Sequence, residues 1–253
     1  MLRTRVIPCL LLRNRALVKT VRFKEPQYVG DPINTVRIFN EKEVDELIFL
    51  DITASAEERE PRFELIQEIA NECFMPFAYG GGVSTLAQIR TLFKLGVEKV
   101  AINSRADSDP DFIRQASQQF GSQSVIASID VKKSLLGKYA VYSHVRRAVT
   151  AHGPVEYARE MERLGAGEIL LTSVDRDGTM SGYDLKLIKM VSQAVQIPVV
   201  ACGGAGGIDD FRSAVDDGGA SAVAVGSMVV YQGPNRAVLI NFPSRAELET
   251  VLG

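Results

Sequence analysis

The segments VIPCLLL, residues 6–12, and VIASIDV, residues 125–131, are two copies of one short apolar run. Both lack regular polar alternation, which is typical of parallel strands that are covered on both faces. The copies lie about 120 residues apart, a distance far too long for a solenoid period, so they indicate a duplicated half-domain. In this alignment Leu11 falls opposite Asp130, so only one copy offers a carboxylate.

Other apolar runs repeat at the same spacing along the chain. Residues 46–51 resemble residues 168–173, and residues 76–82 resemble residues 198–204. Eight runs are expected to be strands: 5–12, 46–51, 76–80, 97–103, 124–130, 168–173, 198–202 and 221–226. Helical periodicity is found in the segments 61–73, 86–95, 111–120, 154–164, 184–194 and 208–217.

This alternation of strands and helices predicts the α/β class and a single (βα)8 TIM barrel over residues 1–253, built from two similar half-barrels. A doubly wound open sheet is the alternative. Ser84 and Asp184 are expected to be helix N-caps. Glycines stand where helices should stop, at Gly96, Gly121, Gly165 and Gly218.

The composition excludes several functional classes. The 29 basic and 31 acidic residues are balanced, so we expect no nucleic acid and no membrane as a partner. The three cysteines, Cys9, Cys73 and Cys202, are isolated, and His144 and His152 are the only histidines. We therefore expect no metal, no cofactor and no disulfide. The N-terminal segment lacks the pattern of a signal peptide, which favours a cytoplasmic protein.

Two glycine-rich turns predict phosphate sites at the carboxyl ends of the strands, where barrels of this kind place their active sites. Turns with uncovered backbone N–H groups and no obstructing side chain can cradle a phosphate. Two such cradles related by the repeat suggest a small-molecule ligand with a phosphate at each end. The alternative is that the glycines only permit tight turns. The cradles consist of Gly81, Gly82, Asn103 and Ser104 in one half, and Gly203, Gly204, Gly226 and Ser227 in the other.

Several polar side chains are expected at the same end. Asp130 is the candidate acid or base, because an enclosed carboxylate can be tuned for proton transfer. Asp51 is either a substrate contact or a cap on the loop that follows it. Asp177 either holds a substrate hydroxyl or shapes a turn. Lys19, expected in a loop after the first strand, is either solvated or folded over a phosphate, and Thr172 ends a strand nearby.

Four charged residues begin strands at the opposite end of the predicted barrel: Arg5, Glu46, Lys99 and Glu168. Two basic and two acidic side chains can form a ring around the barrel axis. Such a ring is either a stabilising ion-pair network or a gate on a path through the barrel. Position alone favours the network, because residues at this face usually serve stability.

These residues lie in stretches that carry a family resemblance over about residues 1–230. The chain resembles HisF, the cyclase (lyase) subunit of imidazole glycerol phosphate synthase. The matching stretches are IPCL (7–10), GDP (30–32), DELIFLDITAS (45–55), GGG (80–82), KVAINS (99–104), FGSQ (120–123) and GAGEILLTSVDRDGT (165–179).

The resemblance implies a (βα)8 barrel that binds a doubly phosphorylated ribonucleotide and receives ammonia from a HisH-like glutaminase partner. By position, the four-residue ring corresponds to the ammonia gate of the family, and the two cradles correspond to its phosphate sites. Lys19 corresponds to the substrate loop, Asp51 to a substrate-contacting acid, and Asp130 to one of two catalytic aspartates.

The second catalytic aspartate of the family corresponds to Leu11, which cannot transfer a proton. Two further departures are the segment Val145-Arg146-Arg147, where a glycine turn is expected, and the tail at residues 231–253. Such departures resemble the HisF paralogues found with a HisH-like glutaminase and a separate amidotransferase in surface-polysaccharide (lipopolysaccharide) pathways.

Three hypotheses follow. The first is a diverged subunit that conducts ammonia for amidation of a sugar by a third protein. The second is an authentic cyclase of histidine biosynthesis that tolerates Leu11. The third is a catalytically silent scaffold that binds a phosphorylated ligand. The charged ring favours the first two over the third, and Leu11 favours the first over the second.

Overall fold

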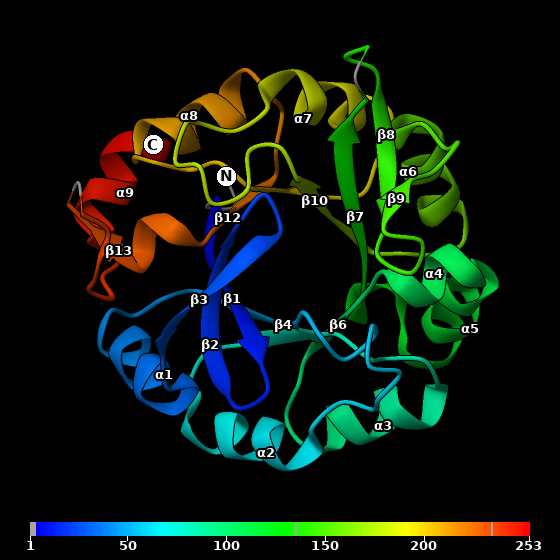
Figure 1. Cartoon of the computed structure of the whole chain (residues 1–253), viewed down its shortest axis with the longest axis horizontal. Helices are drawn as coiled ribbons and strands as arrows, with labels where there is room; N and C mark the ends of the chain where they lie inside the picture. Colours follow the sequence, from blue (N-terminus) through cyan, green and yellow to red (C-terminus); the bar gives the residue numbers. More distant parts are fainter. Residues whose placement is uncertain (1–3, 135, 234) are drawn as a thin grey trace.

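Eight parallel strands close into a barrel in the computed structural model, which describes residues 4–134, 136–233 and 235–253 (Figure 1). Strand β12 pairs with β1 from Arg5 opposite Ala222 to Pro8 opposite Val225, which joins the last strand to the first. In order around the barrel the strands are β1 (Arg5–Arg13), β4 (Leu47–Asp51), β5 (Phe77–Gly80), β6 (Lys99–Ile102), β7 (Val125–Lys133), β10 (Glu168–Ser173), β11 (Val199–Cys202) and β12 (Ala222–Val225).

The predicted (βα)8 barrel is confirmed, and the open doubly wound sheet is wrong, because the eight described barrel strands leave no edge. Some predicted segments contain residues that the structure does not describe. Residues 1–3 belong to the predicted single domain and to the N-terminal segment, and residue 234 belongs to the C-terminal tail. Those positions, like residue 135, lie outside the described residues.

Helices surround the strands as a ring (Figure 1). They are α1 (Pro32–Glu41), α2 (Phe63–Glu72), α3 (Leu86–Lys94), α4 (Ser104–Ser108), α5 (Asp111–Phe120), α6 (Pro154–Arg163), α7 (Leu185–Ser192), α8 (Asp209–Asp216) and α9 (Arg245–Leu252), with the 3-10 turns η1 (Ser122–Ser124) and η2 (Ser227–Val229). The six predicted helices are present, each within two residues at either end. No described helix has the length and apolar character needed to cross a membrane.

Side-chain caps explain where several helices begin. Asp184 caps α7 as predicted, because its carboxylate accepts from Leu187 N at 3.2 Å. The predicted cap Ser84 is wrong by one residue. Thr85 caps α3 instead, accepting from Gln88 N at 3.2 Å, while Gln88 Oε1 accepts from Thr85 N at 3.1 Å. The reciprocal pair is a capping box, and it needs a glutamine three residues after the cap.

Helix α1 was not predicted, although the sequence carries its signals. Asp31 accepts from Asn34 N at 2.9 Å, and Pro32 occupies the first helical position, which its fixed φ angle suits. The chain reaches this helix only after an additional hairpin, so the segment did not fit a simple alternation of one strand and one helix.

The core has two layers. The larger layer lies between the barrel and the helices and includes Phe39, Phe49, Tyr79 and Phe211. A smaller apolar cluster fills the barrel interior and consists of Ile7, Cys9, Ile48, Ala78, Ala101, Ile126, Leu170, Val200, Ala222 and Ala224. Alternate residues along each strand face the interior, so the strands are apolar on both sides.

Strands β1 and β7 both run past the barrel into antiparallel arms that were not predicted. One arm pairs β1 with β2 (Ala16–Val21) and then β3 (Lys24–Gly30). The other pairs β7 with β8 (Tyr139–Ser143) and then β9 (Ala148–Val149). Lys19 therefore lies on strand β2, and its expected position in a loop was wrong. The arms meet where the ring centroid of Phe23 lies 5.4 Å from that of His144.

The C-terminal tail closes the helical ring between α8 and α1 (Figure 1). Its Phe242 ring packs edge-on against Phe39 of α1 with centroids 6.3 Å apart. Arg212 of α8 donates from Nε to the carbonyl oxygen of Val251 at 2.9 Å. A short pair of strands, β13 (Tyr231–Gln232) and β14 (Ala237–Val238), precedes helix α9. The tail thus covers the junction of the first and last barrel units.

We expect Thr85→Ala to lower the free energy of unfolding by about 1 kcal/mol, because the cap on α3 and its reciprocal bond with Gln88 are lost. Urea denaturation followed by circular dichroism measures the change. Thr85→Ser keeps the hydroxyl and is the matched control, with a clearly smaller loss. Equal losses for the two variants would mean that the cap does not stabilise the helix.

Candidate functional site

A cavity of about 380 Å³ opens at the carboxyl ends of the barrel strands. Every candidate substrate, phosphate or catalytic residue named at this end lines it: Lys19, Asp51, Gly81, Gly82, Asn103, Ser104, Asp130, Thr172, Asp177, Gly203, Gly204, Gly226 and Ser227. The two half-barrels therefore contribute to one cavity. The functional role of each residue remains a prediction.

Most of the cradle glycines are required by the backbone itself. Gly81 has φ +111°, and a Cβ there would lie 2.3 Å from the carbonyl oxygen of Asp51. Gly204 has φ +118°, and its Cβ would lie 2.2 Å from the carbonyl oxygen of Gly182. The positive φ angle and the short distance exclude a side chain at each of the two positions, whether or not a ligand binds. The tight-turn interpretation is thus satisfied at these positions, and it does not exclude phosphate binding.

Gly226 differs from the other cradle glycines. Its φ is −125°, which any residue can adopt, but a Cβ there would lie 2.2 Å from Lys19 Nζ. Glycine at this position therefore makes room for the lysine ammonium group beside the turn at Ser227. This contact links the β2–β3 arm to the second cradle.

Lys19 is only 7% exposed, so the solvated alternative is wrong. Its Nζ donates to the carbonyl oxygen of Cys9 at 2.8 Å. Within the described residues, no carboxylate oxygen lies within 4.0 Å of Nζ. A buried ammonium group with no carboxylate in direct contact is costly, and an anion bound beside it would offset that cost.

Asp51 acts as a loop cap in this structure. Its Oδ1 accepts from the backbone N–H groups of Thr53 and Ala54, both at 3.1 Å. Arg59 Nη2 lies 2.7 Å from Asp51 Oδ2 and forms an ion pair in which Asp51 is buried and Arg59 is half-buried. One of the two interpretations of Asp51, the cap, is therefore observed, and a substrate contact remains a prediction.

Asp177 ties the loop after β10 to the β2–β3 arm. Thr20 Oγ1 donates to its Oδ2 at 3.0 Å, and Arg22 N donates to its carbonyl oxygen at 2.9 Å. Burial raises the pKa of Asp177 above its usual range, although the nearby charge of Lys19 opposes the shift. The turn role is served as well, since Gly178 follows with φ +70°.

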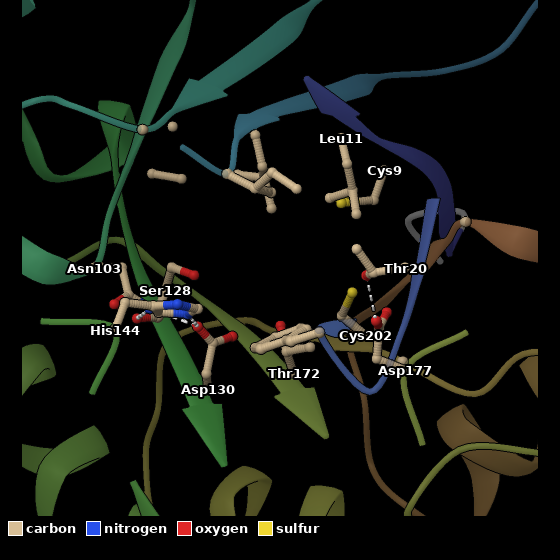
Figure 2. A pocket seen from close by; sticks show the side chains of 18 of the residues that line it. Cys9, Leu11, Thr20, Asn103, Ser128, Asp130, His144, Thr172, Asp177 and Cys202 are labelled. Atoms are coloured by element: carbon tan, nitrogen blue, oxygen red, sulfur yellow. Dashed lines mark hydrogen bonds and ion pairs between the residues drawn. The ribbon is translucent and has the colours of Figure 1, made fainter. Parts of the chain in front are cut away.

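Asp130 belongs to a hydrogen-bonded group on one wall of the cavity (Figure 2). Asn103 Nδ2 donates to its Oδ2 at 2.9 Å and to the carbonyl oxygen of Ser128 at 3.0 Å. His144 Nε2 lies 2.7 Å from the same Oδ2. His144 was not predicted as a site residue, because only the turn of the β7–β8 arm brings it back over Asp130.

The carboxylate of Asp130 changes the acidity of His144. Burial by itself lowers the pKa of the imidazole, but the hydrogen bond and the charge of Asp130 outweigh burial, so the pKa is raised above its usual value. The His144 side chain remains 40% exposed. Leu11 lies on the opposite wall and offers only apolar surface (Figure 2).

The four charged strand-start residues form a closed ring at the other end of the barrel. Arg5 pairs with Glu46 at 2.5 Å and also with Glu168. Lys99 pairs with Glu46 at 2.8 Å and with Glu168 at 3.1 Å. Both glutamates are buried. The predicted ring is therefore present, and its alternating charges satisfy each other.

The described residues contain no group of three His, Cys, Asp or Glu side chains placed to hold a metal ion. Cys9 and Cys202 are free thiols at the base of the cavity. The groups that line the cavity and can bind a ligand or move a proton include carboxylates, an imidazole, a lysine, these two thiols and backbone N–H groups.

A family model described as histidine biosynthesis protein matches residues 5–234. A Pseudomonas aeruginosa protein provisionally named imidazole glycerol phosphate synthase subunit hisF2 is 53% identical over 249 residues, which cover 98% of this chain and 99% of that protein. A Vibrio vulnificus protein provisionally named subunit hisF3 of the same synthase is 45% identical over 253 residues, covering 100% and 97%. Imidazole glycerol phosphate synthase subunit HisF of Alkaliphilus metalliredigens is 46% identical over 231 residues, covering 91% and 92%.

Proposed function

The chain belongs to the histidine biosynthesis family as a HisF-type member, and we propose that it is the synthase subunit of a glutamine amidotransferase complex. In this proposal the cavity binds a doubly phosphorylated ligand, and the barrel receives ammonia from a HisH-like glutaminase at its opposite end. The ammonia serves amidation of a surface-polysaccharide sugar, carried out with a third, amidotransferase protein.

One observation carries the proposal: the charged ring and the cavity lie at the two ends of one apolar interior. Cys9 and Ala224 belong both to the interior cluster and to the cavity wall. Neutral ammonia can enter an apolar interior, whereas ammonium loses its hydration there at high cost. Delivery through the barrel would therefore keep ammonia in its reactive form until it reaches the ligand.

Two features support a ligand with phosphate groups. The Lys19 ammonium lacks a carboxylate partner among the described residues and lies against Gly226 of one cradle. The other cradle, at Gly82 and Asn103, is related to it by the internal repeat and lines the same cavity. Paired anion sites at the two ends of a cavity suit a molecule with two phosphate ends.

Leu11 supports a pathway other than histidine biosynthesis. It lines the cavity opposite Asp130, so acid/base chemistry that requires a carboxylate at position 11 as well as at Asp130 lacks one partner, although Asp51 and Asp177 also line the cavity. The names hisF2 and hisF3 of two relatives agree with a diverged branch.

An authentic cyclase of histidine biosynthesis is the second candidate. It is favoured by the retained Asp130 and by the 46% identity with the Alkaliphilus metalliredigens subunit HisF. The third hypothesis is a silent phosphate-binding scaffold. A scaffold requires no charged ring beneath the cavity, whereas a closed ring with two buried glutamates is present.

We expect phosphate, sulfate or a sugar bisphosphate to occupy both cradles, one at Gly82 and Asn103 and one at Gly204 and Ser227. Gly226→Ala should displace the Lys19 ammonium and weaken binding of inorganic phosphate by about tenfold, or about 1.4 kcal/mol. Isothermal titration calorimetry measures the affinity. Gly30→Ala, at a glycine with open space around it and outside the cavity, is the control. A crystal grown in phosphate with both cradles empty would contradict this prediction.

We expect ammonia-dependent turnover of the family's ribonucleotide substrate to be several orders of magnitude below that of an ordinary cyclase. Leu11→Asp should raise it by ~10²–10⁴-fold, the usual contribution of a positioned acid/base group. Steady-state formation of the imidazole product measures the gain. Leu11→Asn, which is polar but cannot transfer a proton, should not raise turnover. Wild-type turnover at an ordinary cyclase rate would contradict the diverged pathway.

We expect Lys99→Ala to uncouple the glutaminase from ammonia use while the barrel stays folded. The fraction of ammonia lost to solution should rise about tenfold. This corresponds to a change of about 1.4 kcal/mol in the barrier to passage through the barrel, relative to the barrier to escape into solution. Both rates are measured in the reconstituted complex beside a melting curve. In the proposed complex the glutaminase covers the ring and the nearby exposed Glu98.

Lys94→Ala, on the exposed side of α3, is the control for the loss of a lysine charge. If Lys99→Ala lowers the melting temperature and leaves the coupling unchanged, the ring has only its structural role.

A further inference from the structure

His144 is one of two histidines in the chain. It lines the cavity beside Asp130, the member of the family's catalytic pair that this chain retains. The other, His152, lies outside the cavity, where its ring packs at 6.0 Å from that of Tyr157. The position of His144 results from the arm formed by β7 and β8, which turns the chain back over Asp130.

The hydrogen bonds around His144 orient it for proton transfer. Its Nε2 lies 2.7 Å from Asp130 Oδ2, and Asn103 Nδ2 donates to that same oxygen at 2.9 Å. Asn103 is held in turn by the carbonyl oxygen of Ser128. Nδ1 of His144 has no hydrogen-bond partner among the described residues. The imidazole therefore has one nitrogen fixed by a carboxylate and one available to a ligand.

Two aromatic rings hold the imidazole in place. Phe23, from the tip of the β2–β3 arm, lies tilted against it with centroids 5.4 Å apart. Tyr142, from β8, meets it edge-on at 5.3 Å. The ring is thus packed on its sides while 40% of the side chain stays accessible, which suits a group that must meet a bound molecule.

We propose that His144 is a catalytic residue of this cavity and works as an acid/base group, with Asp130 and Asn103 as positioning residues. Nδ1 accepts a proton from the nitrogen of ammonia as that nitrogen bonds to a carbonyl carbon of the ligand. Asp130 stabilises the resulting imidazolium through Nε2–H. Nδ1 then gives that proton to the former carbonyl oxygen, which becomes a hydroxyl. In a second transfer Nδ1 takes another proton from the same nitrogen and gives it to the hydroxyl, which leaves as water as a C=N bond forms. Both protons come from ammonia, so the imidazole ends neutral and no other reactant is needed.

This arrangement places acid/base chemistry on one wall of the cavity. Instead of an acid at position 11 facing Asp130, the cavity has Asp130 and the imidazole side by side, and Leu11 opposite them. A carboxylate that orients an imidazole and stabilises its charged form is an effective combination for general base catalysis. The inference rests on the proposed function, because it needs a ligand and ammonia in the cavity, and it places a reaction of ammonia with that ligand here, separate from the step carried out with the third protein.

The alternative role of His144 is to anchor the β7–β8 arm to the barrel. Because Asp130 raises the pKa of His144, the pair contributes stability that is fully present below the histidine pKa of the unfolded chain. That contribution is lost as the pH rises through the raised pKa. An anchor predicts a stability change with pH and no effect on turnover.

Charged groups on several elements can influence His144 and must be considered in a pH study. They are Asp130 and Lys132 of β7, Arg146 and Arg147 of the arm, Arg22 beside Phe23, Asp107 of α4 bonded to Ser143, and Lys19 and Asp177 across the cavity. Of these, Asp130 is the carboxylate bonded directly to the imidazole.

The first test is an NMR titration of the whole protein. Two histidine signals are expected, and His152→Gln assigns them because it removes one. We expect the pKa of His144 to lie above the usual histidine value and to fall in Asp130→Asn. A His144 signal that titrates identically in wild type and Asp130→Asn would overturn the pairing.

The second test measures turnover of the family's ribonucleotide substrate with the free ammonia concentration held constant at every pH. Wild type should show a low rate, above the rate without protein, that rises with pH through the pKa of His144. His144→Gln should lose that pH dependence and a further ~10²-fold in kcat, with little change in KM. Asp130→Asn should move the rise to lower pH. His152→Gln should match wild type.

Each outcome decides the inference. If His144→Gln keeps the wild-type kcat and pH profile, or changes only the melting temperature, His144 is an anchor and not a catalytic residue. Wild-type turnover no faster than the reaction without protein would also overturn it. Phosphate binding and glutaminase coupling are measured separately, so failure of this inference and failure of the proposed function can be distinguished.

Discussion

The closure of eight parallel strands is the constraint on which the rest of this structure depends. Once β12 pairs with β1, all strands point the same way around one axis, and their carboxyl ends share one rim. Residues far apart in sequence, such as Asp51, Asp130 and Gly204, then line one cavity. Closure also removes sheet edges and leaves a narrow apolar interior between that cavity and the charged ring.

Closure alone does not explain the asymmetry of the cavity, which comes from the two arms. The β2–β3 arm inserts Lys19 beside Gly226, while the β7–β8 arm brings His144 over Asp130. Phe23 connects the arms across the rim. The duplicated halves thus keep the same framework, and they place a lysine ammonium on one side and an imidazole–carboxylate pair on the other.

Membership of the histidine biosynthesis family and the presence of Leu11 in the cavity favour different functions. The first agrees with the proposal that the barrel receives ammonia and binds a phosphorylated ligand, and the second leaves a leucine at the position opposite Asp130. The proposed amidation complex reconciles them, because ammonia delivery depends on the ring and the interior and not on a second acid. The retained acid, Asp130, is already hydrogen-bonded to His144.

The sequence by itself determined the barrel, its internal repeat, the rim residues and the charged ring, because hydrophobic periodicity and duplication are local patterns that can be read along the chain. It did not predict the arms, so it placed Lys19 in a loop and did not identify His144 as a partner of Asp130. Those contacts depend on where antiparallel extensions of β1 and β7 fold back in space. Such pairing is long-range, and only the tertiary structure decides which side chains it brings together.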